Sequence, residues 1–228
     1  MFDVIIPLRS GSKGLHNKNI QKFNKEILVN HLLKKIIKLK DIRYIFILTD
    51  SEIYKKKIIK NYKINKEYIR PKKYSNDNSK IYDLIRDFFK WSSQRSYKLK
   101  NILLLQVTSP LLLQNEIINT INFIKNKKIN SLFHVSEMIE HPYECIIISK
   151  KGWKYLKKSK KVNRQNFKKF YFITGSLYFF TKNFFLKYKK FYNEKSLPYK
   201  IDKINFIDID TKFDLEIAKK LFNLKIRN

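Results

Sequence analysis

Cysteine, glycine and alanine are scarce in this sequence. The single cysteine, Cys145, excludes an internal disulfide and a cysteine metal cluster. We interpret Cys145 as a small buried hydrophobic residue rather than as a nucleophile. No apolar run approaches the roughly 20 residues of a membrane-spanning helix, and the first residues lack the basic start and cleavage site of a signal peptide. We therefore expect a cytoplasmic protein without a membrane partner.

Acidic residues are also in the minority. The chain has 50 lysines and arginines against 19 aspartates and glutamates, a formal net charge of +31. Such a charge fits a basic nucleic-acid-binding module, but the lysines are spread along the whole chain rather than gathered in one arm or tail. A general bias of composition explains this spread better. We therefore expect only non-specific attraction to nucleic acid, which weakens with salt.

Apolar residues are numerous enough for a folded core. Hydrophobic residues make up 43% of the 228 positions, which suits one domain over residues 1–228. Short apolar runs predict buried strands at 4–6, 44–48, 102–105 and 131–135. Helical spacing predicts helices at 28–39, 51–61, 81–91 and 115–125. This alternation is typical of an α/β fold with a Rossmann-like, mostly parallel sheet covered on both faces.

The second half of the chain is less regular. Residues from about 137 to 170 break the alternation, and we interpret them as an inserted arm, with dimerisation as its suggested purpose. A strand resumes around Gly175, a last strand is predicted at 205–210, and a closing helix at 214–224. Ligands of parallel sheets bind at the carboxyl ends of the strands. These ends are Pro7-Leu8-Arg9, Thr49-Asp50 and Gln106-Val107-Thr108.

A polar loop with two glycines follows the first predicted strand. It reads Leu8-Arg9-Ser10-Gly11-Ser12-Lys13-Gly14-Leu15-His16-Asn17-Lys18-Asn19. The glycines let backbone N–H groups point inward and the basic side chains add positive charge, a combination that suits a polyphosphate. The spacing matches neither a Walker loop nor the dinucleotide fingerprint. An ordinary turn between a strand and a helix therefore stays an alternative.

Two aspartates alternate with isoleucines near the end of the chain, in Ile207-Asp208-Ile209-Asp210. In a strand, both carboxylates would share one face, where they repel each other unless a cation lies between them. Mg²⁺ takes one or two carboxylates plus phosphate oxygens. One interpretation is therefore a Mg²⁺ site facing a triphosphate. The other is a solvent-facing edge strand in which Asp210-Thr211 caps the last helix.

The segment from Arg9 to Leu15, with Lys18-Asn19, resembles the signature of the CMP-N-acylneuraminate synthetase (acylneuraminate cytidylyltransferase) family. Further segments resemble that family in the same order over nearly the whole chain. They are Thr49-Asp50, Arg70-Pro71 with Asp77, Leu105-Gln106 with Thr108-Ser109-Pro110, His141-Pro142, Gly175 with Tyr178, and Ile207-Asp208-Ile209-Asp210-Thr211 with Asp214-Leu215. The resemblance implies a fold of the nucleotide-diphospho-sugar transferase type and a homodimer.

The reaction that this resemblance implies is activation of a nonulosonic, sialic-acid-like sugar acid by CTP, with Mg²⁺ as cofactor. The anomeric hydroxyl of the sugar would attack the α-phosphate of CTP, giving a CMP-sugar and pyrophosphate for glycan biosynthesis. Positioning and charge neutralisation would supply most of the acceleration. A sugar nucleotidyltransferase with another nucleotide or acceptor stays an alternative.

Site residues follow from the positions that match the family. The implied catalytic residues are Arg9, Lys18 and Asp210. The implied nucleotide-binding residues are Leu8, Arg9, Gly11, Ser12, Lys13, Lys18, Asn19, Arg70 and Asp77. The implied sugar-binding residues are Gln106, Thr108, Ser109, His141, Thr174 and Gly175, and the metal ligands are Asp208 and Asp210. Arg70 as a solvated turn residue and His141 as a structural histidine remain alternatives.

Three positions depart from the family pattern where a carboxylated sugar would bind. Leu112 stands where sialate-type members usually have arginine, Glu144 stands where some have lysine, and Phe172 lies in a stretch where arginine and asparagine are common. The sequence therefore supports nucleotide activation better than it identifies the acceptor, and weakened activity stays possible. The whole hypothesis requires Arg9 and Asp210 to converge on one cleft.

Overall fold

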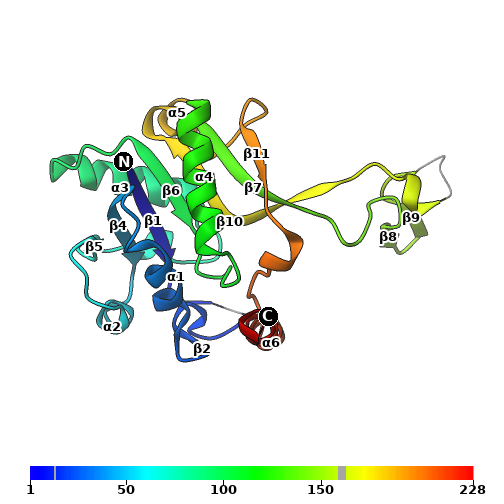
Figure 1. The fold of residues 1–228 in the computed structure, drawn as a ribbon, viewed down its shortest axis with the longest axis horizontal. Coiled ribbons are helices and arrows are strands. Elements are labelled where there is room, and N and C mark those ends of the chain that lie inside the picture. Colours follow the sequence, from blue (N-terminus) through cyan, green and yellow to red (C-terminus); the bar gives the residue numbers. More distant parts are fainter. Residues whose placement is uncertain (13, 159–162, 228) are drawn as a thin grey trace.

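A seven-stranded sheet forms the middle of the protein in a computed structural model that describes residues 1–12, 14–158 and 163–227 (Figure 1). The strand order is β11-β7-β10-β6-β1-β4-β5. Every strand runs in the same direction except β10, which is antiparallel to both of its neighbours. The strands are β1 (Phe2–Leu8), β4 (Ile42–Thr49), β5 (Ile64–Asn65), β6 (Asn101–Leu105), β7 (Ser131–Glu137), β10 (Tyr171–Thr181) and β11 (Leu197–Lys200).

Helices cover both faces of this sheet. They are α1 (Leu28–Ile36), α2 (Glu52–Lys57), α3 (Ile81–Gln94), α4 (Gln114–Lys127), α5 (Lys182–Tyr188) and α6 (Lys212–Arg227). Side chains from α1, α4 and α6 join one hydrophobic cluster, and those from α3 and α5 join the other. Neighbouring strand residues enter opposite clusters, as Val4 and Ile5 do, because side chains alternate across a strand. The predicted mostly parallel α/β fold is confirmed.

One predicted helix ends early, and one predicted strand does not join the sheet. The helix predicted at 51–61 starts after its Ser51 cap but ends at Lys57, because the Asn30 side chain donates to the Lys57 carbonyl at 3.1 Å and accepts from the Ile59 N–H at 3.1 Å. These bonds replace those of a further helical turn.

The strand predicted at 205–210 is also wrong. Residues Lys203–Asn205 form a 3-10 turn (η4), and residues 206–210 have no regular secondary structure and join no sheet. A backbone bond from Ile209 N to Thr108 O, 2.9 Å long, ties this segment to the loop after β6. The edge of the sheet is instead taken by β11, which pairs with β7. The alternation still holds, because Ile209 is fully buried while Asp208 and Asp210 are exposed.

Between β7 and β10 the chain leaves the sheet and forms an arm, described at residues 138–158 and 163–170, which projects from the body in Figure 1. It carries an antiparallel hairpin of β8 (Ile146–Ser149) and β9 (Gly152–Tyr155). Cys145 lies just before this hairpin and is half-buried, so the expectation of a buried cysteine is met only in part. Across the described part of the chain, no helix combines the length and apolarity needed to cross a membrane.

Candidate active site

A cleft of about 300 Å³ opens at the carboxyl ends of β1 and β6. It is formed by residues from the loop after β1, the segment around η2 (Lys72–Tyr74), the loop after β6 and the segment before α6. The lining residues are Pro7, Arg9, Ser12, Gly14, Lys18, Asn19, Arg70, Ser79, Ile81, Gln106, Val107, Thr108 and Asp210. Arg9 and Asp210 therefore share one cleft, as the hypothesis requires.

The loop after β1 is held from outside by β4 and α2. A carboxylate oxygen of Asp50 accepts the Ser10 N–H at 2.9 Å, and its second oxygen accepts the Ser10 hydroxyl at 2.9 Å. The Tyr54 hydroxyl donates to Asn17 at 3.1 Å. Burial raises the pKa of Tyr54 to about 12, and the charge of Asp50 adds to this shift. The tyrosine therefore stays a neutral donor that braces the loop.

Two cations of the cleft are paired with carboxylates. The Arg9 guanidinium lies 2.7 Å from an Asp77 oxygen, and the Lys18 ammonium lies 2.8 Å from an Asp210 oxygen. The side chain of Lys18 is 16% exposed, whereas that of Asp210 is 72% exposed. Asp210 can therefore turn towards a ligand, while Lys18 stays held against the protein.

Gly14 shows how closely the two ends of the chain approach. A Cβ at this position would lie 2.5 Å from the carbonyl oxygen of Asp210. That separation is far below a normal van der Waals contact, so a side chain here would push the loop and the C-terminal segment apart.

Arg70 forms the opposite wall of the cleft and is almost fully buried. Two nitrogens of its guanidinium, Nε and Nη2, donate to the Tyr74 carbonyl. The bond from Nε is 2.9 Å long. Burial lowers the pKa of Arg70, and the nearby charge of Arg9 adds to this effect. The alternative of a solvated turn residue is therefore wrong, because desolvation and a carbonyl partner fix this side chain in the wall.

Gln106 and Thr108 line the other end of the cleft. The Thr108 hydroxyl lies 3.5 Å from the Gln106 carboxamide oxygen. Gly175 adopts a left-handed conformation with φ +74°, and a Cβ there would meet the Gln106 carboxamide at 3.7 Å. The backbone of β10 at Gly175 therefore lies close to the carboxamide of Gln106.

Residues 4–226 match the family described as Cytidylyltransferase. The chain belongs to this family. It is 28% identical to an N-acylneuraminate cytidylyltransferase of Streptococcus agalactiae over 98% of its own length and 54% of the relative's. The chain thus spans about half the length of that relative. It is also 26% identical to the CMP-N,N'-diacetyllegionaminic acid synthase of Legionella pneumophila, covering 96% of this chain and 95% of that protein.

Solved structures show the same fold. A CMP:2-keto-3-deoxy-manno-octonic acid synthetase complexed with CTP superposes with a TM-score of 0.67 and 11% identity, covering 98% of this chain and 99% of that one. A 4-diphosphocytidyl-2C-methyl-D-erythritol synthase from Anaerococcus prevotii gives a TM-score of 0.65 at 15% identity over 97% of this chain and 96% of that one. These likenesses show the fold, and the match of residues 4–226 confirms the family inferred from the sequence motifs.

Two of the predicted sugar-binding residues, His141 and Thr174, are not among those that line the cleft. His141 lies in the arm, where its ring contacts Tyr143 and Phe167 and hydrogen-bonds the Lys168 carbonyl at 2.9 Å. This placement fits the alternative of a structural histidine. Thr174 is buried behind Gly175, and its hydroxyl lies 2.9 Å from that of Ser176.

Other nucleotide- and sugar-binding assignments differ in how exposed they are. Leu8 is fully buried at the end of β1, Ser109 is buried beside the cleft, and Gly11 is exposed with open space around it. Ser12 and Asn19 line the cleft, and Asn19 also donates to the Arg9 carbonyl at 3.0 Å. Lys13 lies outside the described residues.

The two aspartates proposed as metal ligands lie in the extended segment before α6. Although the Asp208 residue as a whole is exposed, desolvation of its carboxyl group raises its pKa, and the charges of Asp210 and Asp214 raise it further. A cation between these carboxylates would relieve this mutual repulsion. Within the described ranges, no cluster of three or more potential ligands forms a complete cage. Two carboxylates beside a phosphate-sized cleft nevertheless fit Mg²⁺, which shares its sites with substrate oxygens.

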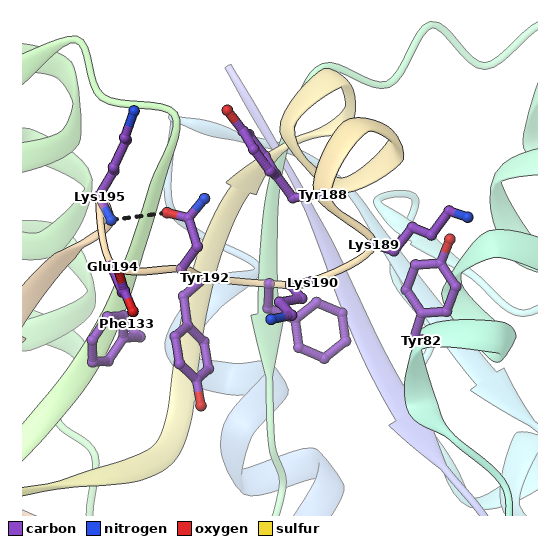
Figure 2. A pocket seen from close by; sticks show the side chains of 10 residues that line it. Tyr82, Phe133, Tyr188, Lys189, Lys190, Tyr192, Glu194 and Lys195 are labelled. Carbon is purple, nitrogen blue, oxygen red and sulfur yellow. Dashed lines mark hydrogen bonds between the residues drawn. The ribbon is translucent and has the colours of Figure 1, made fainter.

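An aromatic pocket that the sequence reasoning missed lies under the turn after α5 (Figure 2). Figure 2 shows Tyr82 of α3 on one side and Phe133 and Tyr192 on the other. The hollow has a volume of about 790 Å³. The ring of Tyr178 stacks on Tyr192 with centroids 5.9 Å apart, and burial, Tyr192 and Asp208 together raise the pKa of Tyr178 to about 12.

Tyr178 connects this aromatic pocket with the cleft. Its hydroxyl would lie 3.8 Å from a Cβ on Gly175, the residue that approaches Gln106. The sequence signal for the pocket was the run Phe191-Tyr192 after a helix, but aromatic residues are common throughout this chain. The spacing alone therefore did not distinguish a pocket from core.

Proposed function

We propose that this chain is a CTP-dependent cytidylyltransferase that activates a nonulosonic sugar acid, giving a CMP-sugar and pyrophosphate. The observation that carries the proposal is the convergence of Arg9, Lys18 and Asp210 on one cleft of a cytidylyltransferase fold. The likeness to a legionaminic acid synthase over 95% of that protein supports a sugar acid as acceptor.

In the proposed complex, Arg9 and Lys18 exchange their carboxylate partners for the phosphates of CTP. Fixed cations of this kind offset the charge that grows on the α-phosphate and on leaving pyrophosphate. Arg70 and Asn19 form the wall that contacts the cytidine, because buried amide and guanidinium donors can reach a base carbonyl.

Asp208 and Asp210 would hold Mg²⁺, which supplies charge neutralisation for the triphosphate and lowers the pKa of the attacking hydroxyl. The chain itself keeps Asp210 next to Lys18, so that this carboxylate lies within reach of both the cation and the phosphates. Asp214 is engaged elsewhere, because its carboxylate accepts the N–H groups of Asp210 and Thr211 at 3.0 and 2.7 Å as the cap of α6.

We infer that the acceptor lies between Gln106 and the aromatic pocket. In this arrangement the sugar ring of the acceptor, with its hydroxyl groups, would face Gln106 and Thr108. The apolar substituents of the sugar would enter the aromatic pocket beside Tyr192. Two of the departures from the sialate-type pattern support an acceptor other than sialic acid. Leu112 is 1% exposed and belongs to the core. The ring of Phe172 packs against that of Phe206, with their centroids 5.1 Å apart. Neither side chain can therefore offer a positive charge to the carboxylate of a sugar acid.

A pyrophosphate-release assay tests the proposal. The purified protein is incubated with Mg²⁺, one of CTP, UTP or TTP, and one of sialic, legionaminic, pseudaminic or 2-keto-3-deoxy-octonic acid. We expect release with CTP and one of the nonulosonic acids. Release only with UTP or TTP, or with none of the acids, contradicts it. Arg9→Gln serves as the inactive variant, and Arg95→Gln, which removes an arginine from the end of α3, as the control.

We also propose that the arm forms a homodimer interface. Its hairpin is exposed along both strands, and Ile148 and Trp153 are 78% and 62% exposed. Large exposed apolar side chains clustered on a projecting element are typical of an association surface. Light scattering should give a dimer for the wild type and a monomer for Trp153→Glu. Ile53→Asp, at an isoleucine of α2 that is 64% exposed, should remain dimeric.

The proposed use of CTP also supports a cytoplasmic location, because CTP is a metabolite of that compartment. Nucleic acid would bind this chain only through its net charge of +31. Filter binding of single-stranded DNA should therefore weaken steeply as salt rises. Tight binding at physiological salt with a preference for one sequence would favour a nucleic-acid-binding module instead.

A further inference from the structure

Strand β10 loses its pairing with β7 beside the cleft. Ile173 is paired with Val135, but the next paired residue, Tyr178, is opposite Phe133. The residues between them form a bulge that contains Gly175 in its left-handed conformation. A bulge interrupts the hydrogen bonds between paired strands and changes the direction of neighbouring side chains. Other contacts must therefore keep the β10 bulge in a single conformation.

His134 of β7 lies opposite the bulge and supplies these contacts. The residue is fully buried. Its Nδ1 lies 3.2 Å from the Ser176 hydroxyl, and its Nε2 lies 2.9 Å from the Thr120 hydroxyl on α4. The Ser176 hydroxyl is also 2.9 Å from that of Thr174. A polar chain thus runs from α4 through β7 to both sides of Gly175.

The direction of these hydrogen bonds follows from the hydroxyl of Thr120. It donates its single proton to the Glu116 carbonyl at 2.7 Å, so its oxygen accepts from the Nε2–H of His134. The Nδ1 atom then carries no proton and accepts from Ser176. Burial lowers the pKa of His134 to about 3, which keeps the ring neutral in this arrangement.

The bulge in turn sets the surroundings of Gln106. The Ser176 carbonyl accepts the Gln106 N–H at 3.3 Å, and Gly175 lies against the Gln106 carboxamide. A movement of Ser176 would therefore reach both the backbone and the side chain of Gln106, which lines the cleft.

We propose that His134 is a positioning residue that, through Ser176, fixes the β10 bulge and thereby the place where Gln106 meets the acceptor sugar. The inference rests on the proposed function for the identity of that ligand. Among the described residues, no hydrogen bond joins Arg9 or Arg70 at the nucleotide end of the cleft to this polar chain. We therefore expect the polar chain to leave CTP binding unchanged.

A matched pair of substitutions at His134 separates positioning from simple packing. Asparagine places an amide oxygen near the position of Nδ1 and can accept from Ser176, whereas glutamine reaches the position of Nε2 and can donate to Thr120. We expect His134→Asn to keep the KM for the acceptor within about twofold. His134→Gln and Ser176→Ala should raise it about threefold to tenfold, the loss of one hydrogen bond, while the KM for CTP is unchanged.

Thr120→Val controls for loss of stability. It removes the other hydrogen bond of the ring but leaves Nδ1 free to bond Ser176 in either tautomer. This variant should unfold at a lower temperature and keep the wild-type KM for the acceptor. Thermal unfolding of all four variants identifies any that do not fold.

Equal KM values for the acceptor in Ser176→Ala, His134→Gln and the wild type would overturn the proposal, as would parallel changes in the KM for CTP. Failure of the proposed function is seen separately, as absent pyrophosphate release by the wild type. Crystal structures of the wild type and Ser176→Ala then decide the positioning without turnover. A displaced Gln106 carboxamide supports the proposal, and an unmoved one overturns it.

Discussion

The ammonium group of Lys18 lies 2.8 Å from a carboxylate oxygen of Asp210, although 192 positions separate the two residues. Neither residue belongs to the central sheet. The contact joins the loop that follows β1 to the segment that precedes α6, and Gly14 permits the close approach. The cleft is therefore closed by two loops whose relative position depends on the whole fold.

Neutralising Asp210 should abolish turnover without unfolding the protein. Its side chain is largely exposed, and exposed ion pairs contribute only about 0–1 kcal/mol to stability. We expect Asp210→Asn to lower the rate of pyrophosphate release about 100-fold or more and to leave the unfolding temperature nearly unchanged. Glu216→Gln removes an exposed carboxylate of α6 that pairs with Lys219 and should keep full activity. Equal rates in both variants would contradict the assignment of Asp210.

Adding one methyl group at Gly14 should separate the two loops. Because the new Cβ would overlap the Asp210 carbonyl, we expect Gly14→Ala to weaken CTP binding about tenfold or more and to cost about 1–3 kcal/mol of stability. Gly11→Ala is the matched control, since a Cβ there meets open space. Calorimetric titration with CTP measures the affinity of both variants. If the two variants bind CTP equally well, the close approach is not required for the nucleotide site.

Asp50 should matter for CTP binding although it is not among the residues that line the cleft. Asp50→Ala leaves the Ser10 N–H without its acceptor, which we expect to cost about 1–3 kcal/mol and to weaken CTP binding by loosening the loop. Ser51→Ala removes the neighbouring cap of α2 at about 1 kcal/mol. Only the first variant should bind CTP less tightly. A loss of CTP affinity in Ser51→Ala of the same size would show that stability alone is responsible.

His31 should make the protein sensitive to mild acid. Burial lowers its pKa to about 4, and the charge of Lys35 lowers it further, while the Pro110 carbonyl and Glu26 oppose the shift. An unfolded chain takes up this proton near pH 6.5, whereas the folded chain does so only near pH 4. The unfolded state therefore binds more protons between these values, and stability falls as pH falls through this window.

The replacement His31→Phe tests this pH dependence. The phenyl ring suits a site between Phe23 and Phe222, and the Pro110 carbonyl keeps its bond from Lys35 at 2.6 Å. Between pH 7 and 4.5 the wild type should lose roughly 2–3 kcal/mol more than the variant. Urea unfolding at both pH values measures the difference. An equal loss of unfolding free energy in the wild type and in His31→Phe would mean that His31 does not cause this pH dependence.

The sequence by itself determined the strands β1, β4 and β6 and the helices that follow them, because each is specified by a local pattern of apolar residues. It also contained the glycine loop and the late aspartates in the order of the family motifs. Their proximity was expected only from the family resemblance, because residues 206–210 join no sheet. The capping of α6 was likewise visible in the short sequence Thr211 to Asp214.

Only the tertiary structure decided which of these residues meet. Asn30 ends α2 from a distant helix, β11 rather than residues 205–210 takes the sheet edge, and His141 is held in the arm. The same is true of the aromatic pocket at Tyr192 and of the bulge behind Gln106. Such contacts join residues far apart in the chain, so their free energy depends on packing and desolvation that no local pattern records.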